Sequence, residues 1–158
     1  MPVRDLPPSE CEPQVFASRN EAVAWYDRER SSILAAARTA ADLGLHDQVW
    51  QLSAAVYQVA YVLRASFDDS LAMSRLGLES ARRVGARHAE AAILGNLGVT
   101  CTMSNRHDDA ESYHRASLEI SRDIGDAEQE TRNTIRVRGP RSSGAQVATR
   151  LESPDAMI

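Results

Sequence analysis

An internal repeat constrains this chain more than any other feature of its sequence. A shift of 40 residues places Asp68, Asp69, Arg75, Leu78, Glu79, Arg82, Gly85 and Glu90 on Asp108, Asp109, Arg115, Leu118, Glu119, Arg122, Gly125 and Glu130. A period of roughly 34–45 residues, built from two helices and a tight turn, is typical of a helical solenoid. The repeat therefore predicts helical hairpins that bury their apolar faces by stacking on one another.

The apolar pattern divides the chain into five helices, with a sixth that can start at Asp126. We expect them at about residues 20–43, 47–63, 68–84, 88–103 and 108–124. The second has the clearest pattern, because its apolar residues recur at steps of three and four, as on one face of a helix; they are Val49, Leu52, Val56, Val59 and Leu63. The predicted fold is all-α, a solenoid of five to six antiparallel helices.

Capping residues set the ends of these helices. Ser18 and Glu21 have capping-box spacing, in which each side chain accepts a hydrogen bond from a free backbone N–H at the helix start. Gly44, Gly85 and Gly125 follow the first, third and fifth helices, where a left-handed glycine closes a helix. The connections are therefore predicted to be short.

Three regions follow from these patterns. Residues 1–17 contain four prolines and no apolar period, so we expect a disordered leader. Residues 18–132 form the repeat domain. Residues 133–158 contain Gly139, Pro140 and Gly144 and lose the apolar period, which predicts a disordered, Arg-containing tail. The abrupt change after Arg132 suggests a truncated or frame-disrupted gene, a hypothesis that the other reading frames beyond codon 132 would test.

Composition and charge exclude several functions. The formal net charge is −4, so the chain as a whole offers no electrostatic reason to bind nucleic acid or an anionic membrane. The N-terminus lacks a signal peptide, and the longest apolar stretch, residues 52–63, is too short to cross a bilayer. We expect a soluble, cytoplasmic protein with no direct nucleic-acid or membrane contact.

The reactive side chains do not form a recognisable catalytic or metal-binding pattern. His88, His107, His114 and Cys101 lack the i,i+4 and CxxC spacings that place two ligands on one side of a metal ion. The chain also lacks a GxSxG nucleophile turn. We therefore expect no metal, no cofactor and no enzymatic activity. Trp25, Trp50, Tyr57 and Tyr61 are interpreted as packing residues between hairpins.

The chain resembles the tetratricopeptide repeat in its longer, roughly 40-residue form. The residues that carry this resemblance are Asn96, Leu97, Gly98, Cys101, Asn105, Ala110, Tyr113 and Leu118. Tyr61 matches the usual aromatic residue in the preceding unit, whereas Gln58, Ser70 and Ser117 depart from the usual small residues. The resemblance implies a non-catalytic module that binds a protein or peptide in a groove lined by the first helix of each hairpin.

A second resemblance covers about residues 15–132. Residues 21–25 (EAVAW), 29–30 (ER), 40–44 (AADLG) and 50–52 (WQL) look like the junction leading into the repeats of bacterial NB-ARC (STAND-type) transcriptional regulators. This implies an alternative function, a fragment of an ATP-dependent regulator whose partner is the nucleotide-binding module. The chain has no GxxxxGK[ST] phosphate loop, so nucleotide hydrolysis is not carried over.

Candidate partner-binding residues lie at predicted outward-facing positions of the second and fourth helices: Gln58, Arg64, Asn96 and Thr100. An Asn amide there can pair with a backbone amide of the partner. The chain also has two basic clusters, one around Arg82, Arg83, Arg87 and His88 and the other at Arg132, Arg136, Arg138 and Arg141. Arginines near a helix C-terminus complement the helix dipole, which gives the first cluster a structural explanation. Exposed apolar surface on the fifth helix predicts a possible homodimer.

Overall fold

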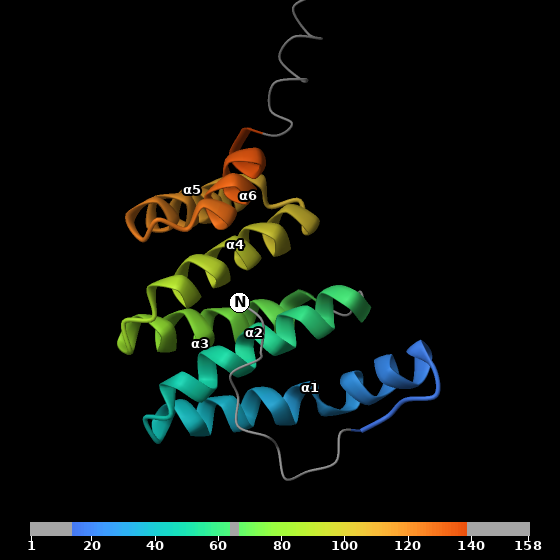
Figure 1. Cartoon of the computed structure of the whole chain (residues 1–158). Coiled ribbons are helices and arrows are strands. Elements are labelled where there is room, and N and C mark those ends of the chain that lie inside the picture. Colours follow the sequence, from blue (N-terminus) through green and yellow to red (C-terminus); the bar gives the residue numbers. More distant parts are fainter. Residues whose placement is uncertain (1–13, 64–66, 139–158) are drawn as a thin grey trace, which may run out of the picture.

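The computed structural model describes residues 14–63 and 67–138, which form six helices stacked in chain order (Figure 1). They are α1 (Arg19–Asp42), α2 (His46–Leu63), α3 (Phe67–Arg83), α4 (Arg87–Met103), α5 (His107–Asp123) and α6 (Ala127–Arg138). The first five agree with the predicted helices to within a residue or two. The all-α fold of sequential antiparallel pairs is confirmed.

Four turns share one hydrogen-bonding pattern, which explains their short length. In each, a backbone N–H donates to a carbonyl five residues earlier, as in the Schellman motif: Leu45 to Ala40, Ala86 to Ala81, Arg106 to Cys101 and Asp126 to Ser121. This motif requires a left-handed residue, and Gly44, Gly85 and Gly125 have φ of 78°, 69° and 70°, as predicted. Asn105, with φ of 57°, takes this role between α4 and α5.

The start of α1 differs from the predicted capping box in one bond. The Ser18 hydroxyl accepts a hydrogen bond from the Glu21 N–H at 3.2 Å, as expected. The Glu21 carboxylate, however, accepts from the N–H of Ala17 at 2.8 Å, one residue before Ser18.

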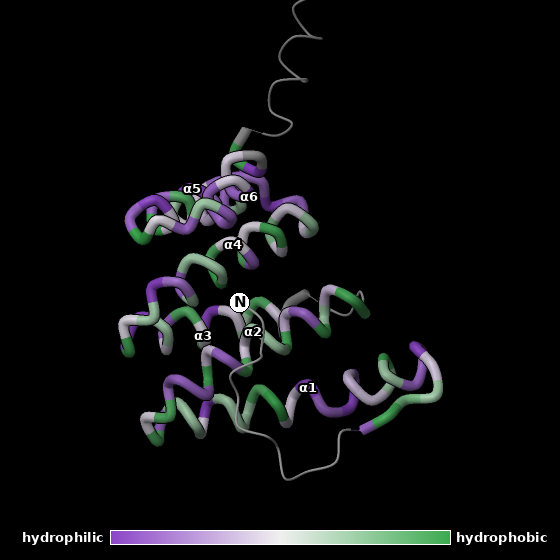
Figure 2. Tube along the Cα trace, viewed as in Figure 1, coloured by the Kyte–Doolittle hydropathy of each residue, from purple (hydrophilic) through white to green (hydrophobic). Residues whose placement is uncertain are grey.

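The core lies between the hairpins. α2 packs most closely on α3, and α4 on α5. One apolar cluster joins α3, α4 and α5 around Ala81, Ile93, Leu97 and Ile120. A second joins α1, α2 and α3 around Tyr26, Val56 and Met73. Figure 2 shows α5 and α6 as the more hydrophilic end of the stack, whereas α2 and α4 carry more apolar residues.

α6 continues to Arg138, beyond position 132 where the loss of apolar period sets the end of the predicted repeat domain. The apolar period fails here because the described buried residues of α6 are polar, namely Gln129 and Asn133. Most of the predicted leader lies outside the described residues. The predicted tail lies outside them from residue 139 onward. The domain boundaries otherwise stay predictions.

The predicted apolar surface on α5 is not found. Ala110 and Ile120 of α5 are buried, and the exposed large apolar side chains of the described residues lie elsewhere, mainly on α2 and in turns. α5 lies between α4 and α6, which cover its apolar side. This removes the stated basis for a homodimer. None of the helices in the described ranges is long and apolar enough to span a membrane.

Candidate partner-binding groove

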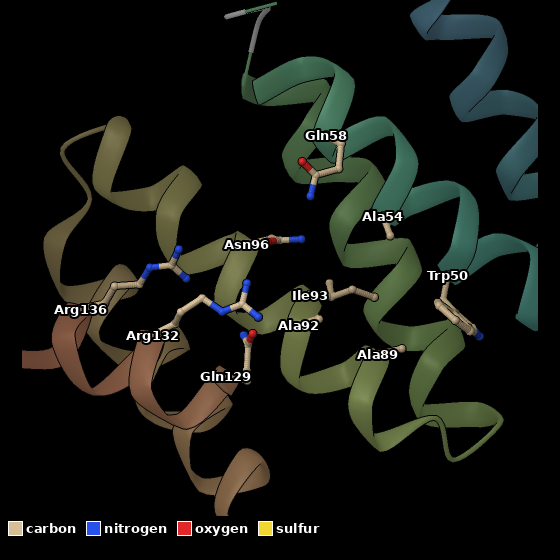
Figure 3. Close-up of a pocket in the computed structure, with 10 residues that line it drawn as sticks. All are labelled: Trp50, Ala54, Gln58, Ala89, Ala92, Ile93, Asn96, Gln129, Arg132 and Arg136. Carbon is tan, nitrogen blue, oxygen red and sulfur yellow. The ribbon is translucent and has the colours of Figure 1, made fainter. Parts of the chain in front are cut away.

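An open groove lies where α2, α4 and α6 meet (Figure 3). Its lining consists of Trp50, Ala54, Gln58, Ala89, Ala92, Ile93, Asn96, Gln129, Arg132 and Arg136. α2 and α4 are the first helices of their hairpins, as predicted for a groove of this fold, and α6 follows them in the stack. The volume is about 130 Å³. This is smaller than the roughly 300–1,000 Å³ of typical small-molecule pockets.

The helical period explains why these residues share one surface. Trp50, Ala54 and Gln58 are four residues apart on α2, and Gln129, Arg132 and Arg136 follow at steps of three and four on α6. Side chains at such spacings lie on the same face of a helix. The 40-residue repeat also relates lining residues of α4 to lining residues of α6. Ala92 is equivalent to Arg132, and Asn96 is equivalent to Arg136. Equivalent positions of two repeats thus carry neutral groups on α4 and guanidinium groups on α6.

The groove is positively charged. Arg132 and Arg136 are exposed, and none of the ten lining residues is acidic. The Arg132 guanidinium contacts the Glu128 carboxylate at 3.1 Å, but Glu128 is itself 82% exposed. Surface ion pairs of this kind contribute little, so Arg132 can exchange its partner. The chain has a net negative charge, yet this face presents two guanidinium groups.

The polar and apolar parts of the lining have different roles. Gln58 is exposed and Asn96 is half-buried, and in Figure 3 the Asn96 amide extends toward α2 and the Gln58 amide toward α4. Ile93 and the alanines form an apolar base. The Trp50 indole N–H donates to an Asp47 carboxylate oxygen at 3.1 Å, which fixes the ring at one end of the groove. The arrangement can therefore accept carboxylates, backbone amides and small apolar side chains.

The predicted candidate residues fall into three groups. Gln58 and Asn96 line the groove. Thr100 does not face outward, which corrects the prediction: its side chain is 3% exposed, and its hydroxyl donates to the Asn96 carbonyl at 3.0 Å. α4 is buried on most sides, so a polar residue on it can be internal. Arg64 lies outside the described residues.

Sequence reasoning missed the contribution of α6. Arg132 and Arg136 were assigned to a basic cluster of the tail, and Gln129 was not singled out. The 40-residue shift carries the signal that would have found them, because it places Arg136 on the candidate Asn96.

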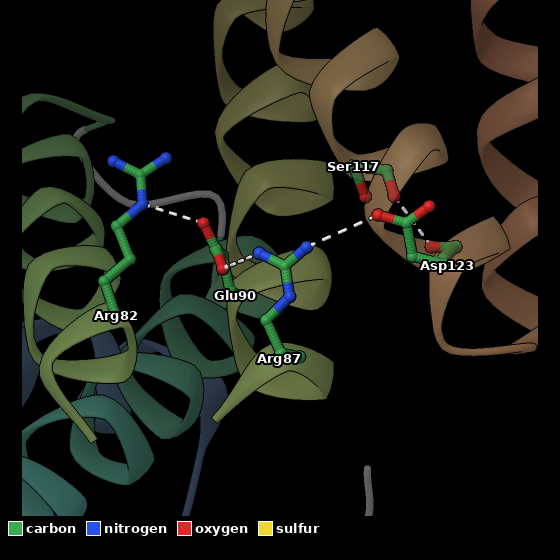
Figure 4. Close-up of polar contacts among 6 residues, drawn as sticks. Arg82, Arg87, Glu90, Ser117 and Asp123 are labelled. Atoms are coloured by element: carbon green, nitrogen blue, oxygen red, sulfur yellow. Dashed lines mark hydrogen bonds and ion pairs between the residues drawn. The ribbon is translucent and has the colours of Figure 1, made fainter. Parts of the chain in front are cut away.

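A separate polar network is centred on Glu90 (Figure 4). The Glu90 carboxylate accepts from Arg82 at 2.8 Å and from Arg87 at 2.7 Å, and Arg87 also contacts Asp123 at 3.6 Å. These ion pairs join α3, α4 and α5. Glu90 is paired with Arg82 of α3 and with Arg87 of its own helix, so the network has a structural explanation.

One histidine and the described cysteine take packing positions. His114 and Cys101 are buried, and burial raises the pKa of the Cys101 thiol. Burial, with a smaller effect of the Arg136 charge, lowers the pKa of His114 to about 4. In the part of the chain that the structure describes, no three His, Cys, Asp or Glu side chains are grouped so as to hold a metal ion.

Comparison with protein families gives one finding. Residues 52–123 match the tetratricopeptide repeat family, a range that runs from within α2 to the end of α5 and thus covers two hairpins. Domains of this family are generally protein-interaction modules and are typically non-catalytic. Comparisons with curated proteins and with solved structures gave no match.

Proposed function

We propose that this chain is a protein-interaction module whose groove binds an extended, acidic segment of a protein partner. The observation that carries the proposal is the pair Arg132 and Arg136, which lie in a groove with amide side chains and no acidic residue in its lining. A guanidinium group donates two parallel hydrogen bonds to a carboxylate, which makes arginine well suited to acidic ligands.

The shape and polarity of the groove support an extended segment as the ligand. Its volume of about 130 Å³ suits individual side chains of a peptide better than a whole small molecule. Gln58 and Asn96 each offer an amide donor and acceptor, which can pair with the backbone of a strand that has no internal partner. Ile93 and the neighbouring alanines leave room for small apolar side chains between the acidic ones.

Fluorescence anisotropy with a labelled peptide of alternating Glu and Ala tests this proposal on the full chain. The charge-neutral control peptide has Gln in place of every Glu. We expect the acidic peptide to bind more tightly, and the double variant Arg132→Gln/Arg136→Gln to weaken its binding by about tenfold or more, since two charge-assisted contacts are lost.

A matched double variant controls for net charge. Arg83→Gln/Arg115→Gln also removes two positive charges, but from exposed positions of α3 and α5 that lie outside the groove lining. Its binding should stay within about twofold of the unmodified protein, because screened surface charges contribute little at a distance. Equal losses in both double variants, or equal binding of the two peptides, would contradict the proposal.

The resemblance of residues 15–132 to NB-ARC regulators supports a second candidate, in which the partner is the nucleotide-binding module of an ATP-dependent transcriptional regulator. Signal transduction through that module and a cytoplasmic location would follow from it. A coding sequence for a nucleotide-binding module directly upstream of the codon for Met1 would favour this candidate. Sedimentation of the purified chain would test the predicted homodimer, for which α5 offers no exposed large apolar side chain.

A further inference from the structure

We propose that α6, which forms one side of the groove, docks reversibly on α4 and α5. The groove, with both of its arginines, would then exist only in the docked state. The docking is a property of this chain alone, whereas its consequence for a ligand rests on the proposed function.

The described side chains that α6 buries are polar, namely Gln129 and Asn133. Asn133 is fully buried, and its side-chain amide donates to the Ser117 hydroxyl at 2.7 Å. That hydroxyl in turn donates to the Ala91 carbonyl at 2.5 Å, which links α6 through α5 to α4. The Asn133 carbonyl oxygen is buried without a hydrogen-bond partner. In the released state water would satisfy it, so one buried group favours release.

The repeat shows what α6 lacks. Positions 53, 93 and 133 are equivalent under the 40-residue shift and are all buried. The residue on α2 is Ser53, that on α4 is Ile93, a member of the apolar cluster of α3, α4 and α5, and that on α6 is Asn133. None of the described α6 side chains belongs to either apolar cluster. The described side chains of α6 therefore dock without the apolar burial that joins α2 to α5.

The fit of α6 on α4 is close and specific. A Cβ added at Gly95 would lie 2.8 Å from the side-chain nitrogen of Gln129 and 3.4 Å from the carbonyl oxygen of Asn133. Gly95 thus lets the two helices approach. A close polar fit of this kind fixes the register of a helix while leaving its docking reversible, because hydrogen bonds to water replace those that are broken.

Release of α6 would dismantle the groove. α6 supplies Gln129, Arg132 and Arg136, whereas α2 and α4 supply the neutral lining. A ligand that contacts the arginines beside Asn96 binds only the docked state, so it would stabilise α6 by linkage. The apparent affinity would equal the affinity of the docked state multiplied by the fraction of molecules in which α6 is docked.

Amide hydrogen exchange of the full chain, followed by mass spectrometry, tests the docking without any ligand. We expect amides of α6 to exchange at least about tenfold faster than those of α4 and α5, because they open without global unfolding. Asn133→Leu should slow exchange in α6 by about tenfold, since it replaces the unpartnered carbonyl with an apolar group and leaves Ser117 bonded to Ala91. Asn133→Asp should speed it by at least as much, because it buries a charge.

α4 and α5 serve as the internal control in every sample. Two outcomes would overturn reversible docking: exchange in α6 as slow as in α4 and α5, or equal changes in all three helices in the two Asn133 variants. In either case α6 would unfold together with α4 and α5 as one cooperative unit. Adding the Glu-Ala peptide separates the two proposals. Slower exchange in α6 on peptide binding supports the linkage, whereas absence of binding counts against the proposed function and leaves the docking result intact.

Discussion

At the scale of single residues, His114 shows how a small neighbour creates a buried titratable group. A Cβ at Gly98 would lie 2.3 Å from a ring carbon of His114, so the ring occupies space that only glycine leaves free. The ring is 3% exposed and its Nδ1 has no hydrogen-bond partner. Burial, followed by the charge of Arg136, lowers the pKa of His114 to about 4. The native state therefore holds this imidazole in its neutral form.

This pKa predicts a loss of stability in mild acid. The unfolded chain binds a proton on His114 below about pH 6.5, and the folded chain does so only below about pH 4. Stability from this group is thus complete above pH 6.5 and falls as the pH drops toward 4. We expect a contribution of about 2 kcal/mol to be lost between pH 7.5 and pH 5.

Urea unfolding at the two pH values measures this loss. The variant His114→Gln has no titrating ring, so its free energy of unfolding should fall by about 2 kcal/mol less than that of the unmodified protein. Comparing the pH dependence of the two proteins cancels any constant cost of the substitution. The same decrease in both would mean that His114 is not the responsible group.

At the scale of helices, one ion pair occurs in two repeats with different burial. Arg82 contacts Glu90 at 2.8 Å, and Arg122 contacts Glu130 at 2.9 Å, at equivalent positions. The Glu90 side chain is 8% exposed, whereas that of Glu130 is 40% exposed. Glu90 also has a second partner, Arg87.

Burial should decide the cost of removing each carboxylate. Glu90→Gln is expected to lower the free energy of unfolding by about 1–3 kcal/mol, because it leaves two arginines facing a buried neutral amide. Their half-exposed guanidinium groups keep water, which limits the cost. Glu130→Gln should cost less than about 1 kcal/mol, as for other exposed pairs. Chemical denaturation of the two variants checks the difference, and a larger cost at Glu130 would contradict it.

Helix positions could be predicted from the sequence where apolar period and turn residues agree. Gly44, Gly85 and Gly125 mark real turns because their left-handed backbone strongly favours glycine. For α6 the apolar period gives no such support. Its described buried residues, Gln129 and Asn133, are polar, and a pattern of apolar spacing does not detect a helix that docks through hydrogen bonds.

The candidate site could be predicted in its location and only partly in its chemistry. The repeat indicates that first helices line a groove, which led to Gln58 and Asn96. Thr100 was misplaced because α4 is enclosed on most sides, so a polar side chain on it can bond internally. The basic character of the groove depends on Arg132 and Arg136, which lie on a helix beyond the predicted apolar period.

At the scale of the whole molecule, the stack is held unevenly along its length. α2 to α5 form two closely packed hairpins, whereas α1 contacts α2 and α3 less closely. Only Tyr26 and Ala37 of the 24 residues of α1 are buried. In repeat proteins each unit is stabilised mainly by its neighbours, so a terminal helix with a single neighbouring hairpin separates more easily than an internal one.

The two tryptophans make this order measurable, because Trp25 lies on α1 and Trp50 on α2. Trp50→Phe leaves a reporter of α1, and Trp25→Phe leaves a reporter of α2. If α1 unfolds before the central hairpins, the Trp25 reporter should have a lower fluorescence midpoint in urea than the Trp50 reporter. We expect a difference of about 0.5 M or more. Far-ultraviolet circular dichroism of both variants, which follows all helices, corrects for any change in global stability. Coincident midpoints by both methods would instead mean that α1 and the central hairpins unfold as one cooperative unit.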